Sequence, residues 1–211
     1  MYKWNGTSWQ NKGAISGTSN SWAGWYVSLN GDGNKVAVGA LNSNGGRGHV
    51  MVYEWNGSWW ASMATINGEM GGGLAGHSVS FSNDGNTLAI GAPKNSTGTV
   101  CVYKWDGSTW NKLGSTIYAD AGTSRGGYSC SLNADGTILA FGASGGKGRV
   151  YIYQYINGLY ASGWVKVGYI DGEAGGDRYG AAISLSKSGS KLVTGALYND
   201  CLLYTSDAAD E

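Results

Sequence analysis

The chain has 211 residues with a formal net charge of zero, 38 glycines, one proline and 10 tryptophans, and 13% of its residues are charged. This much glycine without a three-residue period excludes collagen, and a hydrophobic content of 42% excludes a disordered chain. We expect no membrane span, because no run approaches the roughly 20 apolar residues required, and residues 1–6 do not predict a signal peptide. The balanced charge gives no support to a nucleic-acid partner.

The first predicted elements form a hairpin, in which alternating residues 1–4 are joined by the turn Asn5-Gly6 to a strand that starts at Trp9. A pattern with a period of about 51 residues then recurs along the chain. Each copy begins with a glycine that opens a strand, and these opening glycines are Gly24, Gly76, Gly127 and Gly180. The repeat predicts one supersecondary unit copied several times.

A tight turn and an apolar strand follow each opening glycine. The turns are Asp32-Gly33, Asp84-Gly85, Asp135-Gly136 and Ser188-Gly189, and Asp-Gly supplies the positive φ angles that a short hairpin needs. The apolar strand ends in Gly-Ala 15 residues after the opening glycine, and these closing glycines are Gly39, Gly91, Gly142 and Gly195. The constant distance indicates that no insertion is tolerated between the two glycines.

An alternating strand and a tryptophan-led strand complete each unit, as in residues 50–55 and the strand from Trp60. Four short strands in about 50 residues are typical of a propeller blade, so we predict an all-β fold, a β-propeller of four-stranded antiparallel blades, with about four blades' worth present. A half unit, three complete units and a half unit make up residues 1–200. The five predicted units are about 1–17, 18–67, 68–118, 119–171 and 172–200.

Residues 201–211, CLLYTSDAADE, match no upstream segment. They resemble the in-frame translation of a transposase-end sequencing adapter, and we exclude them from the predicted fold. Without the three acidic residues of this segment the net charge is weakly positive, which still does not suggest nucleic acid. We expect both ends of the propeller fragment to be cut.

The segments 76–105 and 170–196 resemble the FG-GAP repeats of integrin α-subunit β-propellers and their bacterial and algal relatives. The opening glycine, the Asp-Gly turn, Gly-Ala and Gly-x-Val-x-Val-Tyr carry the resemblance, which spans residues 1–200. It implies a propeller of usually seven blades, extracellular or on the cell surface, that binds ligands through loops on one face. This chain would hold just over half of such a ring, although its two half units could instead pair and close a ring of four blades.

The resemblance is incomplete in the hairpin loops, where integrin-type repeats hold calcium. Each loop here has at most one carboxylate, whereas calcium takes six to eight oxygen ligands, so we interpret Asp32, Asp84 and Asp135 as turn formers. No metal site and no cofactor are therefore expected.

The sequence also lacks catalytic constellations. His49 and His77 have no carboxylate, Cys or second His at ligand or triad spacing, and no phosphate-binding loop occurs. Cys101 and Cys130 replace apolar strand residues, which indicates packing thiols. Sialidase and kelch propellers fit the motifs less well than FG-GAP repeats do.

Six residues are candidates for ligand binding through the variable loops: Trp22, Trp25, His77, Arg125, Tyr128 and Arg178. Trp22 breaks the repeat and lies in a loop, where it could stack on a sugar, anchor a protein partner or cap the neighbouring blade. Arg125 and Arg178 align one residue apart in equivalent loops.

We predict a non-catalytic recognition or adhesion scaffold that binds a protein or glycan. The alternatives are a fragment of a propeller-type carbohydrate-active enzyme whose catalytic residues lie outside this chain, and a purely structural repeat of a large surface protein.

Overall fold

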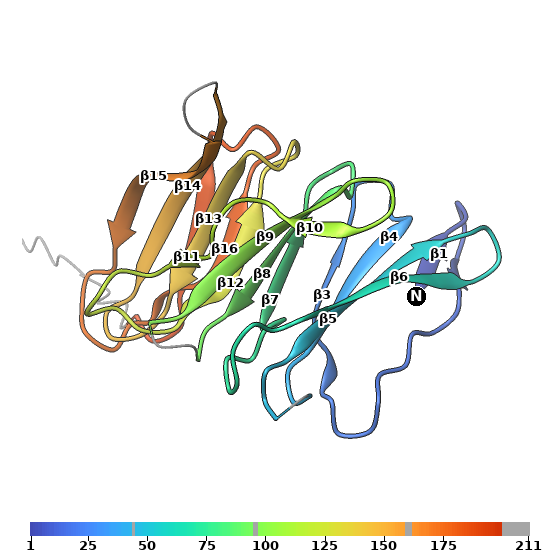
Figure 1. The fold of residues 1–211 in the computed structure, drawn as a ribbon, viewed down its shortest axis with the longest axis horizontal. Helices are drawn as coiled ribbons and strands as arrows, with labels where there is room; N and C mark the ends of the chain where they lie inside the picture. Colours follow the sequence, from blue (N-terminus) through green and yellow to red (C-terminus); the bar gives the residue numbers. More distant parts are fainter. Residues whose placement is uncertain (44, 95–96, 159–161, 200–211) are drawn as a thin grey trace, which may run out of the picture.

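A computed structural model describes residues 1–43, 45–94, 97–158 and 162–199, and the described part of the chain consists of strands and loops without a helix (Figure 1). The predicted adapter-like segment 201–211, with Cys201, lies outside the described residues. An N-terminal hairpin is formed by β1 (Tyr2–Trp4) and β2 (Trp9–Asn11). The all-β prediction is confirmed.

The second predicted unit (18–67) forms one antiparallel sheet in the order β3-β4-β5-β6. Its strands are β3 (Ala23–Leu29), β4 (Lys35–Ala40), β5 (His49–Trp55) and β6 (Trp60–Asn67). The fourth unit (119–171) repeats this topology with β12 (Gly126–Leu132), β13 (Ile138–Ala143), β14 (Arg149–Asn157) and β15 (Ser162–Asp171). The fifth unit (172–200) contributes the hairpin β16 (Tyr179–Leu185) and β17 (Leu192–Ala196).

The third unit (68–118) departs from the predicted four strands because its outer strand is interrupted. Its sheet contains β7 (Ser78–Phe81), β8 (Thr87–Ala92), β9 (Thr99–Trp105), β10 (Trp110–Lys112) and β11 (Ile117–Tyr118). Both β10 and β11 pair with β9. The break contains Gly114 with a positive φ of 80°. The equivalent strands of the second and fourth units, β6 and β15, stay continuous at this position and show only a register shift.

The hairpin turns follow the chemistry that the sequence predicts. The four turn glycines have φ between 65° and 74°, the left-handed region that favours glycine, and they are Gly33, Gly85, Gly136 and Gly189. The Asp84 carboxylate accepts hydrogen bonds from the Ser82 hydroxyl and the Asn86 backbone N–H. Asp135 likewise accepts from Thr137, so these two aspartates act as turn formers.

Successive sheets pack face to face, because β7 packs on β3 and β4, β12 on β7 and β8, and β16 on β12 and β13. The closing glycine of one unit meets the opening glycine of the next at each of these interfaces. A Cβ on Gly142 would overlap the carbonyl oxygen of Gly180, and the same holds for Gly39 with Gly76 and for Gly91 with Gly127. The Gly-Ala motif is therefore fixed by a backbone-to-backbone contact between units.

Hydrogen bonds between units accompany this close approach. The Ser129 hydroxyl donates to the Gly180 carbonyl at 2.7 Å, and Ser78 donates to Gly127 at 2.9 Å. A second set of serines accepts from the backbone N–H of the next unit, namely Ser28 from Phe81, Ser80 from Leu132 and Ser131 from Leu185. Backbone hydrogen bonds also link each hairpin turn to the turn of the next unit. The N–H of Gly31 donates to the Asn83 carbonyl, that of Asn83 to the Ala134 carbonyl, and that of Ala134 to the Lys187 carbonyl.

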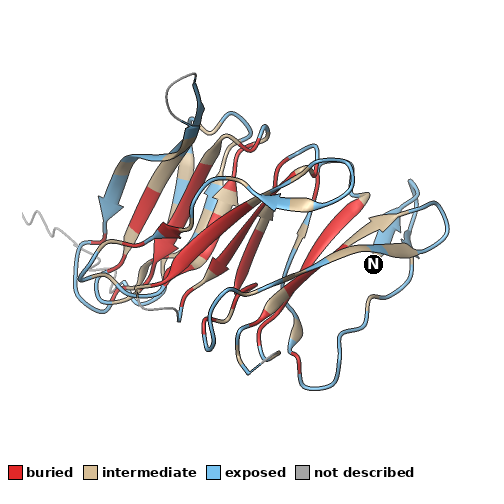
Figure 2. Ribbon diagram, viewed as in Figure 1, coloured by how far each residue is buried: buried red, intermediate tan, exposed pale blue. Residues whose placement is uncertain are grey.

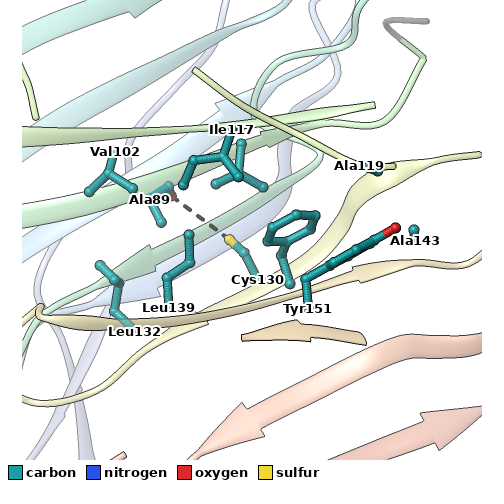
Figure 3. Close-up of a cluster of buried hydrophobic side chains, with 11 residues drawn as sticks. Ala89, Val102, Ile117, Ala119, Cys130, Leu132, Leu139, Ala143 and Tyr151 are labelled. Atoms are coloured by element: carbon teal, nitrogen blue, oxygen red, sulfur yellow. Dashed lines mark hydrogen bonds between the residues drawn. The ribbon is translucent and has the colours of Figure 1, made fainter. Parts of the chain in front are cut away.

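The hydrophobic core lies between the sheets. The buried residues concentrate on β4 and β5 of the second unit and on the first three strands of the third and fourth units (Figure 2). Figure 3 shows the largest cluster, in which Leu139 and Tyr151 of the fourth unit meet Ala89 and Val102 of the third. Cys130 lies in this cluster with its thiol directed toward the Ala89 carbonyl. Cys101 and Cys130 are both buried and free, which confirms their prediction as packing thiols.

The tryptophans at equivalent repeat positions form cross-strand pairs at the outer hairpins. Trp4–Trp9, Trp55–Trp60 and Trp105–Trp110 have ring centroids 5.5–5.7 Å apart. Trp60 also donates its indole N–H to the Lys12 carbonyl of the preceding unit. These rings therefore stabilise the hairpins and the contacts between units.

Candidate functional site

The loop that leads into each inner strand contains a residue with left-handed backbone geometry two positions before the opening glycine. These residues are Trp22, Leu74, Arg125 and Arg178, with φ between 53° and 62°. In each copy the carbonyl of this residue accepts a hydrogen bond from the N–H three positions later, as between Arg125 and Tyr128. The structure corrects one alignment, because Arg125 and Arg178 occupy the same repeat position and are not offset by one residue.

These turns share one face of the molecule with the loops that follow the second strands, and we call it the loop face. Antiparallel pairing places the start of the first strand beside the end of the second strand. The two sets of loops also meet between units, where Gly48 bridges to Ala75, Gly98 to Gly126, and Gly148 to Tyr179. All six ligand-binding candidates therefore lie on the loop face.

Four of the six candidates form a continuous aromatic row across three units. The Trp22 and Trp25 rings stack with centroids 6.2 Å apart, Trp25 lies 5.8 Å from His77, and His77 lies 4.5 Å from Tyr128. Trp22 and Trp25 are each 55% exposed. Trp22 thus stacks on a ring of its own unit, and the row presents aromatic surface to solvent.

His77 holds the centre of the row. Its side chain is buried, and Nδ1 lies 3.0 Å from the Tyr128 carbonyl, so the tautomer with a proton on Nδ1 donates to that oxygen. Burial lowers the pKa of His77, and the positive charges of Arg125 and Lys94 lower it further, against the backbone hydrogen bond that raises it. The neutral ring therefore fixes the position of Tyr128 at neutral pH.

Arg125 and Arg178 lie apart from the row and line a cavity of about 290 Å³ between the fourth and fifth units, the arginine cavity. The remaining lining residues are Ser124, Ser144, Gly145, Gly146, Gly176 and Tyr198. The Arg178 guanidinium lies 4.7 Å from the centroid of the Tyr198 ring. Ser144 and Tyr198 were not candidates from the sequence, although Ser144 follows Gly-Ala where the other copies have Leu41, Pro93 and Leu197.

Three acidic residues of the same loops are occupied by structural contacts. Glu69 forms an ion pair with Lys112, and Asp120 forms ion pairs with Arg149 and Lys166. The buried Asp177 carboxylate accepts from the Ala174 backbone N–H and the Asn199 amide. Among the described ion pairs none involves Arg125 or Arg178.

Within residues 1–43, 45–94, 97–158 and 162–199, no group of three or more His, Cys, Asp or Glu side chains is placed to hold a metal ion. No helix in the described part of the chain is long and apolar enough to cross a membrane.

Comparisons with known proteins find similar folds but no family to which the chain belongs. No family model matches the sequence, and no curated protein matches it. Kuenenia stuttgartiensis hydrazine synthase is 13% identical with a TM-score of 0.57, and the match covers 86% of this chain and 45% of that one. A 6-phosphogluconolactonase candidate from Bacteroides uniformis is 15% identical with a TM-score of 0.56 over 80% of this chain and 46% of its own.

Sqt1 of Saccharomyces cerevisiae is 15% identical with a TM-score of 0.53, over 74% of this chain and 38% of that protein. The chain thus spans less than half the length of these three structures. The chain has a propeller-like all-β fold. At such low identity the similarity concerns the fold and not the activity of these proteins.

Proposed function

We propose that the chain is part of a β-propeller of FG-GAP type and serves as a non-catalytic recognition or adhesion scaffold at the cell surface or outside the cell. The four sheets and hairpins of units two to five act as successive blades, about four blades' worth together with the N-terminal hairpin. The face-to-face packing of sheets through repeated glycine and serine contacts supports this proposal.

The aromatic row carries the functional part of the proposal. Exposed aromatic rings aligned across units offer a flat apolar surface on which a sugar ring or an apolar side chain of a protein partner can stack. Trp22 and Trp25 supply this surface, while the buried His77 ring contacts both Trp25 and Tyr128 and so joins them in one row. Trp25 and Tyr128 lie on the strands β3 and β12, and ring contacts hold the neighbouring side chains of the row, which limits the conformational entropy lost when a ligand binds.

Binding of the full chain to an oligosaccharide array and to a panel of extracellular-matrix proteins tests this function. We expect Trp25→Ala and Trp22→Ala to weaken binding about tenfold or more, the size of a lost aromatic anchor. Trp59→Ala is the matched control, because Trp59 is 64% exposed and belongs to the outer hairpin between β5 and β6. Equal binding by all three variants, or no ligand for the folded protein, would contradict the proposal.

A further inference from the structure

The arginine cavity differs from the equivalent positions of earlier units in three side chains. Arg125 and Arg178 stand where the second and third units have Trp22 and Leu74. Ser144 stands where those units have Leu41 and Pro93. The backbone is the same at both places, since the Gly145 N–H donates to the Ser124 carbonyl as the Asn42 N–H donates to that of Ser21. The repeat scaffold therefore does not require these polar side chains.

The two guanidinium groups bring positive charge to one cavity without a neutralising carboxylate. No described carboxylate lies within ion-pair distance of Arg125 or Arg178, and the nearby Asp177 is held by Ala174 and Asn199. Two like charges at one cavity repel each other, and an anion bound between them is attracted to both, which offsets that repulsion. The planar guanidinium matches carboxylate and sulfate oxygens in geometry.

Ser144 provides an independent observation that points to a ligand. Its side chain is fully buried, and its hydroxyl has no hydrogen-bond partner among the described residues. A buried unsatisfied hydroxyl is costly and rare in folded proteins, and it requires an explanation at this position. Ser144 is one of the residues that line the cavity, and a ligand oxygen that reached its hydroxyl would accept the proton.

The remaining lining residues favour a sugar ring next to the anionic group. Gly145, Gly146 and Gly176 leave the wall without side chains, so a ligand can approach the backbone closely. Tyr198 is 58% exposed and presents a ring face beside Arg178. The volume of about 290 Å³ is at the lower end of small-molecule sites, which suits one sugar residue and not a folded protein surface.

We propose that the arginine cavity binds an acidic saccharide, with the carboxylate or sulfate group between Arg125 and Arg178 and in contact with the Ser144 hydroxyl, and the ring against Tyr198. This inference rests on the proposed recognition function and names the ligand class of a second site on the loop face. Uronates and sulfated sugars share the anionic chemistry that the cavity recognises.

Isothermal titration calorimetry of the full chain tests the site with three ligands: oligogalacturonate, a sulfated galactan oligomer and a neutral galactan oligomer. We expect the acidic oligomers to bind and the neutral one to bind at least tenfold more weakly, with an affinity for the acidic oligomers that falls as salt is added. Arg125→Gln and Arg178→Gln should each weaken acidic binding about tenfold or more, and Ser144→Ala about fivefold. Arg47→Gln is the matched control, because Arg47 is exposed in a loop of the same face.

Each other outcome overturns the assignment in a distinguishable way. Equal losses for Arg47→Gln and Arg125→Gln would mean diffuse charge attraction, and inorganic sulfate or an acidic peptide binding as tightly as the oligomers would exclude a saccharide site. Binding of the neutral oligomer that depends on Trp25 and not on Arg125 or Arg178 would overturn this inference and leave the proposed function intact. No binding of any oligomer or matrix protein by the folded chain would remove both.

Discussion

Two interfaces between units, the one between the second and third units and the one between the fourth and fifth, share a scaffold and differ in their loops. Gly39 meets Gly76 at the first interface as Gly142 meets Gly180 at the second. The first bears Trp22, Leu74 and the buried Leu41, while the second bears Arg125, Arg178 and Ser144. Backbone contacts therefore define how the units dock, and the loop side chains are free to define what each interface binds.

The largest expected effect comes from breaking the shared contact. Gly142→Ala and Gly39→Ala should each lower the free energy of unfolding by about 3 kcal/mol, because the added Cβ overlaps a backbone carbonyl of the next unit. Urea unfolding followed by tryptophan fluorescence measures the change. Gly195→Ala is the control, since its nearest neighbour would be the Ala182 Cβ at 3.7 Å. Equal effects of all three substitutions would refute the contact as the reason for the motif.

The next prediction concerns the substitution of one buried loop residue at each interface. Leu41 is 1% exposed, so Leu41→Ser should cost about 3 kcal/mol through the lost apolar burial and a buried hydroxyl. Ser144→Ala should instead be neutral or stabilise by up to about 1 kcal/mol, because it removes a hydroxyl without a partner. Thermal unfolding of both variants checks the contrast. A loss above about 1 kcal/mol for Ser144→Ala would show that its hydroxyl is satisfied in the folded protein.

The smallest effect concerns pH and the aromatic row beside the first interface. The folded-state pKa of His77 is lowered, so below its ordinary value near 6.5 the unfolded chain binds more protons than the folded chain. Stability should therefore decline as the pH falls from 6.5 through the folded pKa of His77, and His77→Gln should flatten part of this decline. The pKa of His49 is also lowered by burial, so His49 adds to the decline, and His49→Gln measures its share. An unchanged slope in His77→Gln would contradict the prediction.

The all-β architecture and the strand order of the units followed from the sequence, because the turn glycines and alternating strands report on local backbone geometry. The purpose of the Gly-Ala motif did not, since the contact between Gly142 and Gly180 joins residues of different units. The interrupted strand around Gly114 was missed for a similar reason, as the repeat pattern alone predicts a continuous outer strand.

The candidate site was predicted in part. The residues after the opening glycines could be identified because they vary within a constant repeat, and the structure brings Trp25, His77 and Tyr128 into one row. Ser144 could have been found by the same comparison, since a polar residue replaces Leu or Pro there. Tyr198 could not, because its place beside Arg178 depends on the folding of two loops from different strands.

The glycine contacts and serine hydrogen bonds between units also bear on how such a chain changes over generations. The interfaces between units two to five share a glycine contact that recurs at each of them, so a unit that replaced its neighbour would still find this backbone partner. Duplication or unequal exchange within the coding repeat therefore gives chains whose units still dock. Each exchanged unit carries its own loops, so such events produce new combinations of binding surfaces without a new core.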